Sequence, residues 1–189
     1  MAGPVRGRDL SKPAHHEAGH AVVAQILGIE PQSASVTGDE TTQGRVLAAA
    51  ARWTRPEIVI DGRTEMRLHR EIMVCFAGVL AERRLVGRLN RIRASKDYEV
   101  AAAIAMYATT TTEEANALLA WLQTRTDNLV DRNWRIIEVV AAALTRTMTL
   151  DHAQIVTIMQ SAVGCHATDG TCNVAPTLFS QFGGPFGTV

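Results

Sequence analysis

The residues most able to do chemistry lie in one short stretch, His15-His16-Glu17-Ala18-Gly19-His20. It contains the pattern H-E-x-x-H, with His16 and His20 four residues apart. On a helix these two positions lie one turn apart on the same face, so both imidazoles can reach one point in space. Zinc binds neutral imidazole nitrogen at about 2.0–2.1 Å and prefers four ligands in a tetrahedron. The spacing therefore predicts two ligands of a Zn²⁺ site.

Glu17 directly follows the first histidine, and from there its carboxylate can take a proton from a water in the open metal position. Burying two histidines and a glutamate together is costly unless a cation pairs with them. Gly19 stands where a helix favours alanine by about 1 kcal/mol, which indicates that another segment or a substrate comes close. The apolar run that follows (Ala21, Val22, Val23, Ile26 and Leu27) predicts a buried or half-buried helix over about 13–27, closed by Gly28 and Pro31.

Length and composition favour one domain with two flexible ends. The chain has 189 residues, and we expect a domain over 13–163 between an N-terminal segment 1–12 and a tail 164–189. Lys and Arg together number 19, as do Asp and Glu, so no basic field is available to attract nucleic acid. The apolar runs are shorter than the ~20 residues of a membrane span, and three cysteines do not make a disulfide framework. We therefore expect a cytoplasmic protein that binds neither nucleic acid nor membrane.

The pattern of apolar and polar residues predicts a mainly α fold (α+β) with a small sheet of two or three strands after the first helix. The strands are expected between about 33 and 60, as 33–37 and 45–48 joined by a turn. Further helices are expected over 64–86, 96–109, 112–124, 127–147 and 151–163. The segments 112–124 and 127–147 form either two helices or one kinked helix. Ser95, Thr111 with Glu114, and Thr149 or Asp151 are candidate caps. Leu89–Ala94 is expected to be a basic loop, and Cys75 a core residue.

A zinc site with only two histidines would be weak, so a third ligand must come from a later segment. The candidates are His69, Glu82, Asp97, Glu99 and His152, and the residues alone leave the choice open. Glu82 follows an apolar stretch and could face inward, whereas Asp97 precedes an alanine-rich helix that must pack tightly. Cys165, His166 and Cys172 lie in the expected tail, where they could bind a metal or pair oxidatively, but two cysteines in one short tract are weak evidence.

Four motifs, in order along the chain, resemble a known family. They are His15–Val23 with its H-E-x-x-H, Thr42–Leu47 with its glycine, Phe76–Arg83, and Arg93–Ala103 with its aspartate. Together they are similar to the peptidase domain of the FtsH-type, membrane-bound AAA zinc proteases, in which the corresponding segments are the zinc helix, a strand beside the active site, a G-R-x-A-E-E helix and a G-A-x-N-D-L segment. The resemblance covers about residues 12–160.

The resemblance implies that His16, His20 and Asp97 bind zinc and that Glu17 is the general base. It implies a zinc metalloendopeptidase whose polypeptide substrate adds as a strand beside Gly44, Arg45, Val46 and Leu47, and it suggests a hexameric homo-oligomer. The chain also departs from the family: Lys96 replaces an asparagine, Val79 replaces an arginine, and the segment after the aspartate helix is shortened to Thr109–Glu113. No G-x-x-x-x-G-K-[ST] occurs. We therefore expect cleavage of unfolded or flexible polypeptides, unless the chain works with a separate ATPase.

An alternative function is a zinc-stabilised binding or regulatory module that keeps the scaffold but catalyses little. The missing ATPase motif and the shortened segment motivate this alternative. Glu17 argues against it, because a purely structural zinc site has no need of a base.

Overall fold

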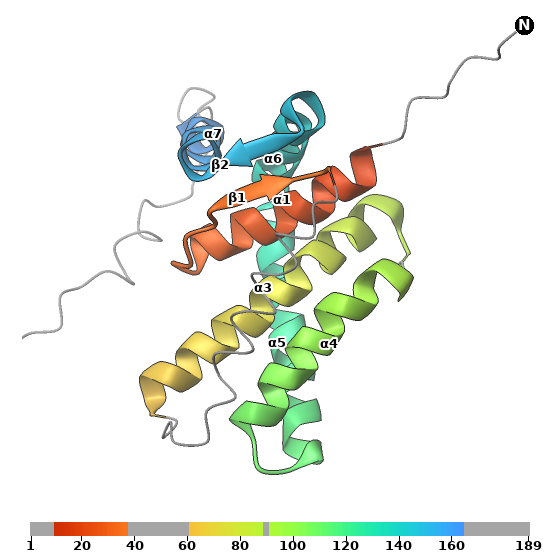
Figure 1. Cartoon of the computed structure of the whole chain (residues 1–189), viewed down its shortest axis with the longest axis vertical. Coiled ribbons are helices and arrows are strands. Elements are labelled where there is room, and N and C mark those ends of the chain that lie inside the picture. The colour runs from red at the N-terminus through yellow and green to blue at the C-terminus, as the bar shows by residue number, and fades with distance from the viewer. Residues whose placement is uncertain (1–9, 38–60, 89–90, 165–189) are drawn as a thin grey trace, which may run out of the picture.

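The computed structural model of the chain describes residues 10–37, 61–88 and 91–164. Within these ranges it contains six helices and one antiparallel sheet of two strands (Figure 1). The predicted fold class, mainly α with a small sheet, is confirmed. None of the helices in these ranges is both long enough and apolar enough to cross a bilayer.

Helix α1, Ser11–Ile26, carries the H-E-x-x-H residues. The helix predicted over 13–27 is therefore confirmed, with a start at Ser11. It ends as predicted: Gly28 has a φ of 72°, and the amides of Gly28 and Ile29 bond to the carbonyls of Gln25 and Ala24. These two bonds satisfy carbonyls that the end of a helix leaves without partners.

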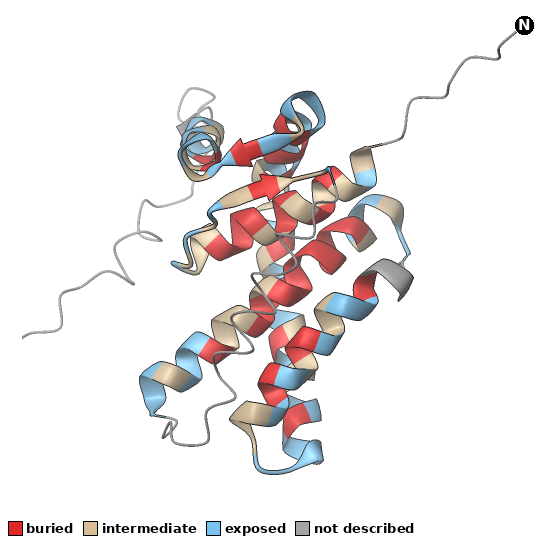
Figure 2. Cartoon of the chain, in the orientation of Figure 1, coloured by how far each residue is buried: buried red, intermediate tan, exposed pale blue. Residues whose placement is uncertain are grey.

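Helix α3, Gly62–Val86, is the central element: α1, α4 and α5 all pack against it. The Asp61 carboxylate caps its start by accepting from the Thr64 amide at 2.7 Å, and Gly87 ends it with a φ of 74°. Apolar residues spaced three and four apart form a stripe along α3, and Figure 2 shows the buried residues of α3 concentrated in the part that runs beside α1. The buried residues of the stripe include Leu68, Ile72, Cys75, Phe76 and Leu80.

The contact between α1 and α3 depends on Gly19. A Cβ atom at this position would lie 2.6 Å from the Ala77 carbonyl oxygen and 2.8 Å from the Ala81 Cβ. Real Cβ contacts are essentially never this short, so the two helix backbones can approach only because residue 19 has no side chain. The prediction that a second segment comes close to Gly19 is confirmed, and that segment is α3.

Helix α4, Arg91–Ala108, starts earlier than predicted. Residues 91–94 are helical, so the basic loop expected over Leu89–Ala94 is wrong from residue 91 on, and the N-cap at Ser95 is wrong as well. Ala94 is buried, so packing stabilises this first turn, and the position of a capping residue in the sequence does not indicate such packing. Among the apolar residues of this alanine-rich helix that are expected to face inward, Val100, Ala101, Ile104 and Ala105 are buried, whereas Ala108 is half-buried.

Helices α5, Thr112–Arg132, and α6, Trp134–Thr147, are separated at Asn133 rather than near residue 125. The predicted end at 124 is wrong, since α5 continues to Arg132. The hydroxyls of Thr124 and Thr126 bond to carbonyls four residues back within this helix. The Asn133 side-chain amide donates to the Leu129 carbonyl at 2.8 Å, where α5 ends. At the start of α5, Thr111 accepts from the Glu114 amide as predicted.

The sheet joins two distant parts of the chain. Strand β1, Ser33–Ser35, pairs antiparallel with β2, Thr149–Asp151, and places Ala34 opposite Leu150. Both central residues are buried, which holds the strands over α1 and α6. The strand predicted over 33–37 is confirmed at Ser33–Ser35, but its partner lies outside the predicted 33–60 region, at a place where the sequence predicts only a helix cap, Thr149 or Asp151. Asp151 does cap α7, His152–Gly164, through the Gln154 amide at 2.8 Å. The strand predicted over 45–48 lies outside the described residues.

Candidate metal centre

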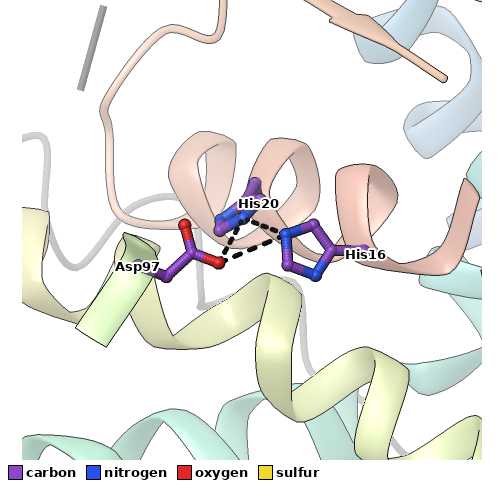
Figure 3. A group of neighbouring side chains, drawn as sticks. All are labelled: His16, His20 and Asp97. Atoms are coloured by element: carbon purple, nitrogen blue, oxygen red, sulfur yellow. Dashed lines mark hydrogen bonds and ion pairs between the residues drawn. The ribbon is translucent and has the colours of Figure 1, made fainter. Parts of the chain in front are cut away.

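His16 and His20 project from one face of α1 toward Asp97, in the second turn of α4 (Figure 3). The two Nε2 atoms are 3.1 Å apart. Asp97 Oδ2 lies 3.2 Å from His16 Nε2 and 3.7 Å from His20 Nε2. Two segments far apart in the sequence thus bring three ligand atoms of the kinds that zinc prefers to one point.

These separations match a tetrahedral zinc site. Ligands at about 2.0–2.1 Å from a tetrahedral ion are about 3.3–3.4 Å from one another, and the three observed edges of 3.1, 3.2 and 3.7 Å bracket that value. The arrangement forms one face of a tetrahedron and leaves the fourth position to a water or a substrate. This is the ligand count of catalytic zinc sites, whereas structural sites use four protein ligands.

Burial singles out the same place. Among the described residues, the buried polar or charged side chains are His16, Glu82 and Thr126. The Thr126 hydroxyl is satisfied within its own helix, by the Leu122 carbonyl at 2.8 Å. His16 and Glu82 face each other, with Nδ1 and Oε2 separated by 3.6 Å. Charged groups are thus concentrated at one buried position, which is costly without a compensating cation.

Two buried atoms at this position lack a hydrogen-bond partner: His16 Nδ1 and Asp97 Oδ2. Buried polar atoms are seldom left in this state, and a cation bound by Asp97 Oδ2 would satisfy that oxygen. The charge of the site also suits a divalent ion. The two carboxylates, Asp97 and Glu82, would balance its charge, and the two imidazoles would be neutral. The residues present therefore fit a zinc ion.

Electrostatics couple the histidines to the carboxylates. Burial alone would lower the pKa of His16, but the carboxylates of Asp97 and Glu82 outweigh it and raise that pKa to about 9. Burial opposes ionisation of Asp97, yet His20 and His16 hold the pKa of Asp97 well below its usual range. Without metal, the site thus holds a proton on His16 next to an ionised carboxylate. A metal ion would replace that proton.

Helix α3 makes room for His20 and orients it. A Cβ at Gly78 would lie 2.3 Å from His20 Nε2, so any side chain at residue 78 would displace the ring. On the other side of the ring, His20 Nδ1 is 2.7 Å from the Val74 carbonyl oxygen. With Nδ1 donating to this carbonyl, Nε2 carries the free lone pair that a metal requires. The chemical importance of Gly78 and of the Val74 carbonyl was not predicted; the available signal was a glycine inside an apolar helical stripe.

Three of the other candidates for the third ligand, His69, Glu99 and His152, do not join the cluster, and Glu82 meets His16 at Nδ1 rather than at Nε2. His69 packs edge-on against Trp121 and is half-buried. His152 Nδ1 lies 3.1 Å from the Pro31 carbonyl oxygen, and Glu99 is exposed. The ligand atoms of His16, His20 and Asp97 lie within 4.8 Å of one another. Asp97, which the resemblance implied, is therefore the candidate that meets the histidines at Nε2.

Other predicted residues have different outcomes. Glu17 is half-buried on α1, and its charge helps to raise the pKa of His16, so it lies close to the site. Gly44, Arg45, Val46 and Leu47, the predicted substrate-binding residues, lie outside the described residues. So do Cys165, His166 and Cys172 and most of the predicted N-terminal segment. Cys75 is buried in the core as predicted, where burial, with the negative charge of Asp97, raises the pKa of its thiol.

Comparison with known proteins adds no family to this geometry: no protein-family model matches the chain, and no curated protein matches it in sequence.

Proposed function

We propose that this chain is a zinc-dependent metalloendopeptidase that hydrolyses peptide bonds of unfolded or flexible polypeptides. The observation that carries the proposal is the convergence of His16 Nε2, His20 Nε2 and Asp97 Oδ2 at separations of 3.1, 3.2 and 3.7 Å. The H-E-x-x-H pattern adds a carboxylate, Glu17, immediately after the first ligand. Hydrolysis requires metal ligands with a base beside them, whereas a structural zinc site needs no base.

His16, His20 and Asp97 would hold the ion. A bound zinc supplies Lewis-acid chemistry: it lowers the pKa of water toward about 7 and polarises a carbonyl. The Glu17 carboxylate accepts the proton of the attacking water and later passes it to the leaving amine nitrogen. The bond that breaks is the peptide C–N bond, and the proton that leaves the water ends on the new amino terminus. Glu17 therefore acts as base in the first step and as acid in the second.

The proposed family is that of the FtsH-type peptidase domains, on the strength of the four motifs. By that resemblance we propose a homo-oligomer, a hexamer in the family. We also propose a cytoplasmic location, because three cysteines do not make a disulfide framework. Cooperation with a separate ATPase would extend the substrates to folded proteins. Two histidines with one carboxylate also bind non-haem Fe(II), but Glu17 beside the ligands favours hydrolysis.

Two measurements test the proposal. Elemental analysis of the purified full chain should find about one zinc per chain, and unfolded casein should be cleaved in a reaction that a chelator stops and added zinc restores. Glu17→Gln should keep the zinc and lose the cleavage, by about 10²-fold or more, the scale of a general base. Zinc without cleavage in the wild type would support the binding module instead. Cleavage at the wild-type rate by Glu17→Gln would remove the base from the mechanism.

A further inference from the structure

Both imidazoles of the site direct their second ring nitrogen toward α3. His20 Nδ1 is 2.7 Å from the Val74 carbonyl oxygen, and His16 Nδ1 is 3.6 Å from Glu82 Oε2. Histidines that bind metal nearly always donate this second N–H to a carbonyl or a carboxylate, which fixes the tautomer and the direction of the ring. α3 offers one acceptor of each kind.

The spacing along α3 explains how one helix serves both rings. Val74, Gly78 and Glu82 follow one another at intervals of four residues, so they share one face of the helix. In a helix the carbonyl of residue 74 lies beside the side chain of residue 78, and because residue 78 is glycine, this carbonyl is open to a second donor. The same missing side chain leaves space for the His20 ring. Glu82, one turn further, meets the other ring.

Glu82 is placed to orient His16 rather than to bind the metal. Its carboxylate is buried and lies on the Nδ1 side of the ring, whereas the ligand atoms that lie within 4.8 Å of one another come from His16, His20 and Asp97. His16 Nδ1 is itself buried without a hydrogen-bond partner. The separation of 3.6 Å exceeds a hydrogen bond by about 0.6 Å, a distance that a small rotation of the ring onto a metal would close.

We propose that Glu82 is a positioning residue, which accepts a hydrogen bond from His16 Nδ1–H and so holds Nε2 toward the metal. Val74 does the same for His20 through its backbone, so Glu82 is the one of these two acceptors that a substitution can remove. The proposal rests on the proposed zinc site. It concerns the affinity for the ion and the state of one ring, and both can be measured without any peptidase activity.

Zinc affinity tests the proposal with three variants of the full chain. We would titrate the metal-free protein with zinc in competition with a chromophoric chelator. Glu82→Leu should bind zinc about 10–100-fold more weakly than wild type, the usual effect of a lost outer hydrogen bond. Glu82→Gln should lose less, because its amide oxygen can still accept the N–H. Glu99→Gln removes an exposed carboxylate two residues from Asp97 and should bind zinc as wild type does.

The state of the ring is read by NMR of zinc-loaded protein with isotope-labelled histidine. The Nδ1–H proton of His16 should give a downfield, slowly exchanging signal in the wild type and in Glu82→Gln. In Glu82→Leu this signal should move upfield or disappear through exchange, while the signal of His20, held by Val74, stays in place. If Glu82→Leu does not fold, Glu82→Gln and this signal decide the question.

The outcomes separate the two proposals. Equal zinc affinity and an unchanged His16 signal in Glu82→Leu would overturn the positioning role and leave the peptidase proposal standing. An equal loss of affinity in Glu82→Leu and Glu99→Gln would also overturn it, since only general charge would then matter. A wild-type protein that binds no zinc would overturn both.

Discussion

Gly78 of α3 lies directly against the imidazole of His20: a Cβ on Gly78 would be 2.3 Å from Nε2, 2.6 Å from Cδ2 and 2.7 Å from Cε1. Every one of these contacts is shorter than a real Cβ makes. The ring also has little freedom to move aside, because its Nδ1 is bonded to the Val74 carbonyl at 2.7 Å. The absence of a side chain at residue 78 is therefore a requirement of the site.

Gly78→Ala should displace His20 and weaken zinc binding by at least about 10–100-fold, the range found for lost outer contacts of metal ligands. The measurement is zinc affinity by chelator competition, with circular dichroism to establish that the helices form. Gly62→Ala is the matched control on the same helix, because no atom lies within 4 Å of a Cβ placed there. Wild-type affinity in Gly78→Ala would show that the ring finds another route to the metal.

Gly19→Ala should act on stability, because its Cβ would meet the backbone of α3 rather than a movable side chain. The contact of 2.6 Å is to the Ala77 carbonyl oxygen, so α1 and α3 must separate. We expect a loss of about 1–3 kcal/mol in the free energy of unfolding, typical of an overpacked interior, measured by urea denaturation. An unchanged midpoint would mean that the two helices tolerate a wider spacing.

Asp97→Ala should remove most of the bound zinc, because two histidines alone hold the ion weakly. Glu99→Ala, an exposed position two residues further along α4, is the control and should keep the metal. The measurement is the zinc content of each purified variant after dialysis. Full occupancy in Asp97→Ala would contradict Asp97 as the third ligand and would reopen Glu82, whose carboxylate faces His16 Nδ1 rather than Nε2 in this structure.

The features that depend on a single stretch of sequence were predicted correctly. The apolar stripe of α3 and the spacing of His16 and His20 are periodic, and each indicated a helix face correctly. Asp97 is remote from the histidines in sequence, so the residues alone left it among five candidates until the resemblance to a family singled it out. The distances now bring it to the histidines, while its role as a zinc ligand stays a prediction.

The errors have physical causes. Strand β2 was missed because three residues carry no measurable alternation. Its pairing with β1 depends on two buried side chains, Ala34 and Leu150, from distant parts of the chain. The early start of α4 comes from packing of Ala94, which a search for caps does not detect. Gly78 matters because it contacts the His20 ring of another helix, α1. A contact between two helices cannot be recognised from one stretch of sequence.

The metal-free protein should lose stability as the pH rises from neutral. The pKa of His16 is raised from its usual 6.5 to about 9 in the folded chain. Its protonated form thus stabilises the fold fully below about pH 6.5, and this contribution disappears as the pH rises through about 9. Between these two pH values the free energy of unfolding should fall by about 3 kcal/mol. Asp97 acts in the opposite sense: its lowered pKa adds stability above its unfolded pKa of about 3.9, and this is lost on acidification.

Urea denaturation of the metal-free protein at a series of pH values measures how its free energy of unfolding changes with pH. In His16→Gln this free energy should depend less on pH above neutral. Zinc affinity should run the other way: the ion displaces the His16 proton, so binding tightens as the pH rises toward about 9. The same proton therefore produces falling stability without metal and rising affinity with it. A metal-free stability that is flat between neutral pH and pH 9 would contradict the coupling of His16 to Asp97 and Glu82.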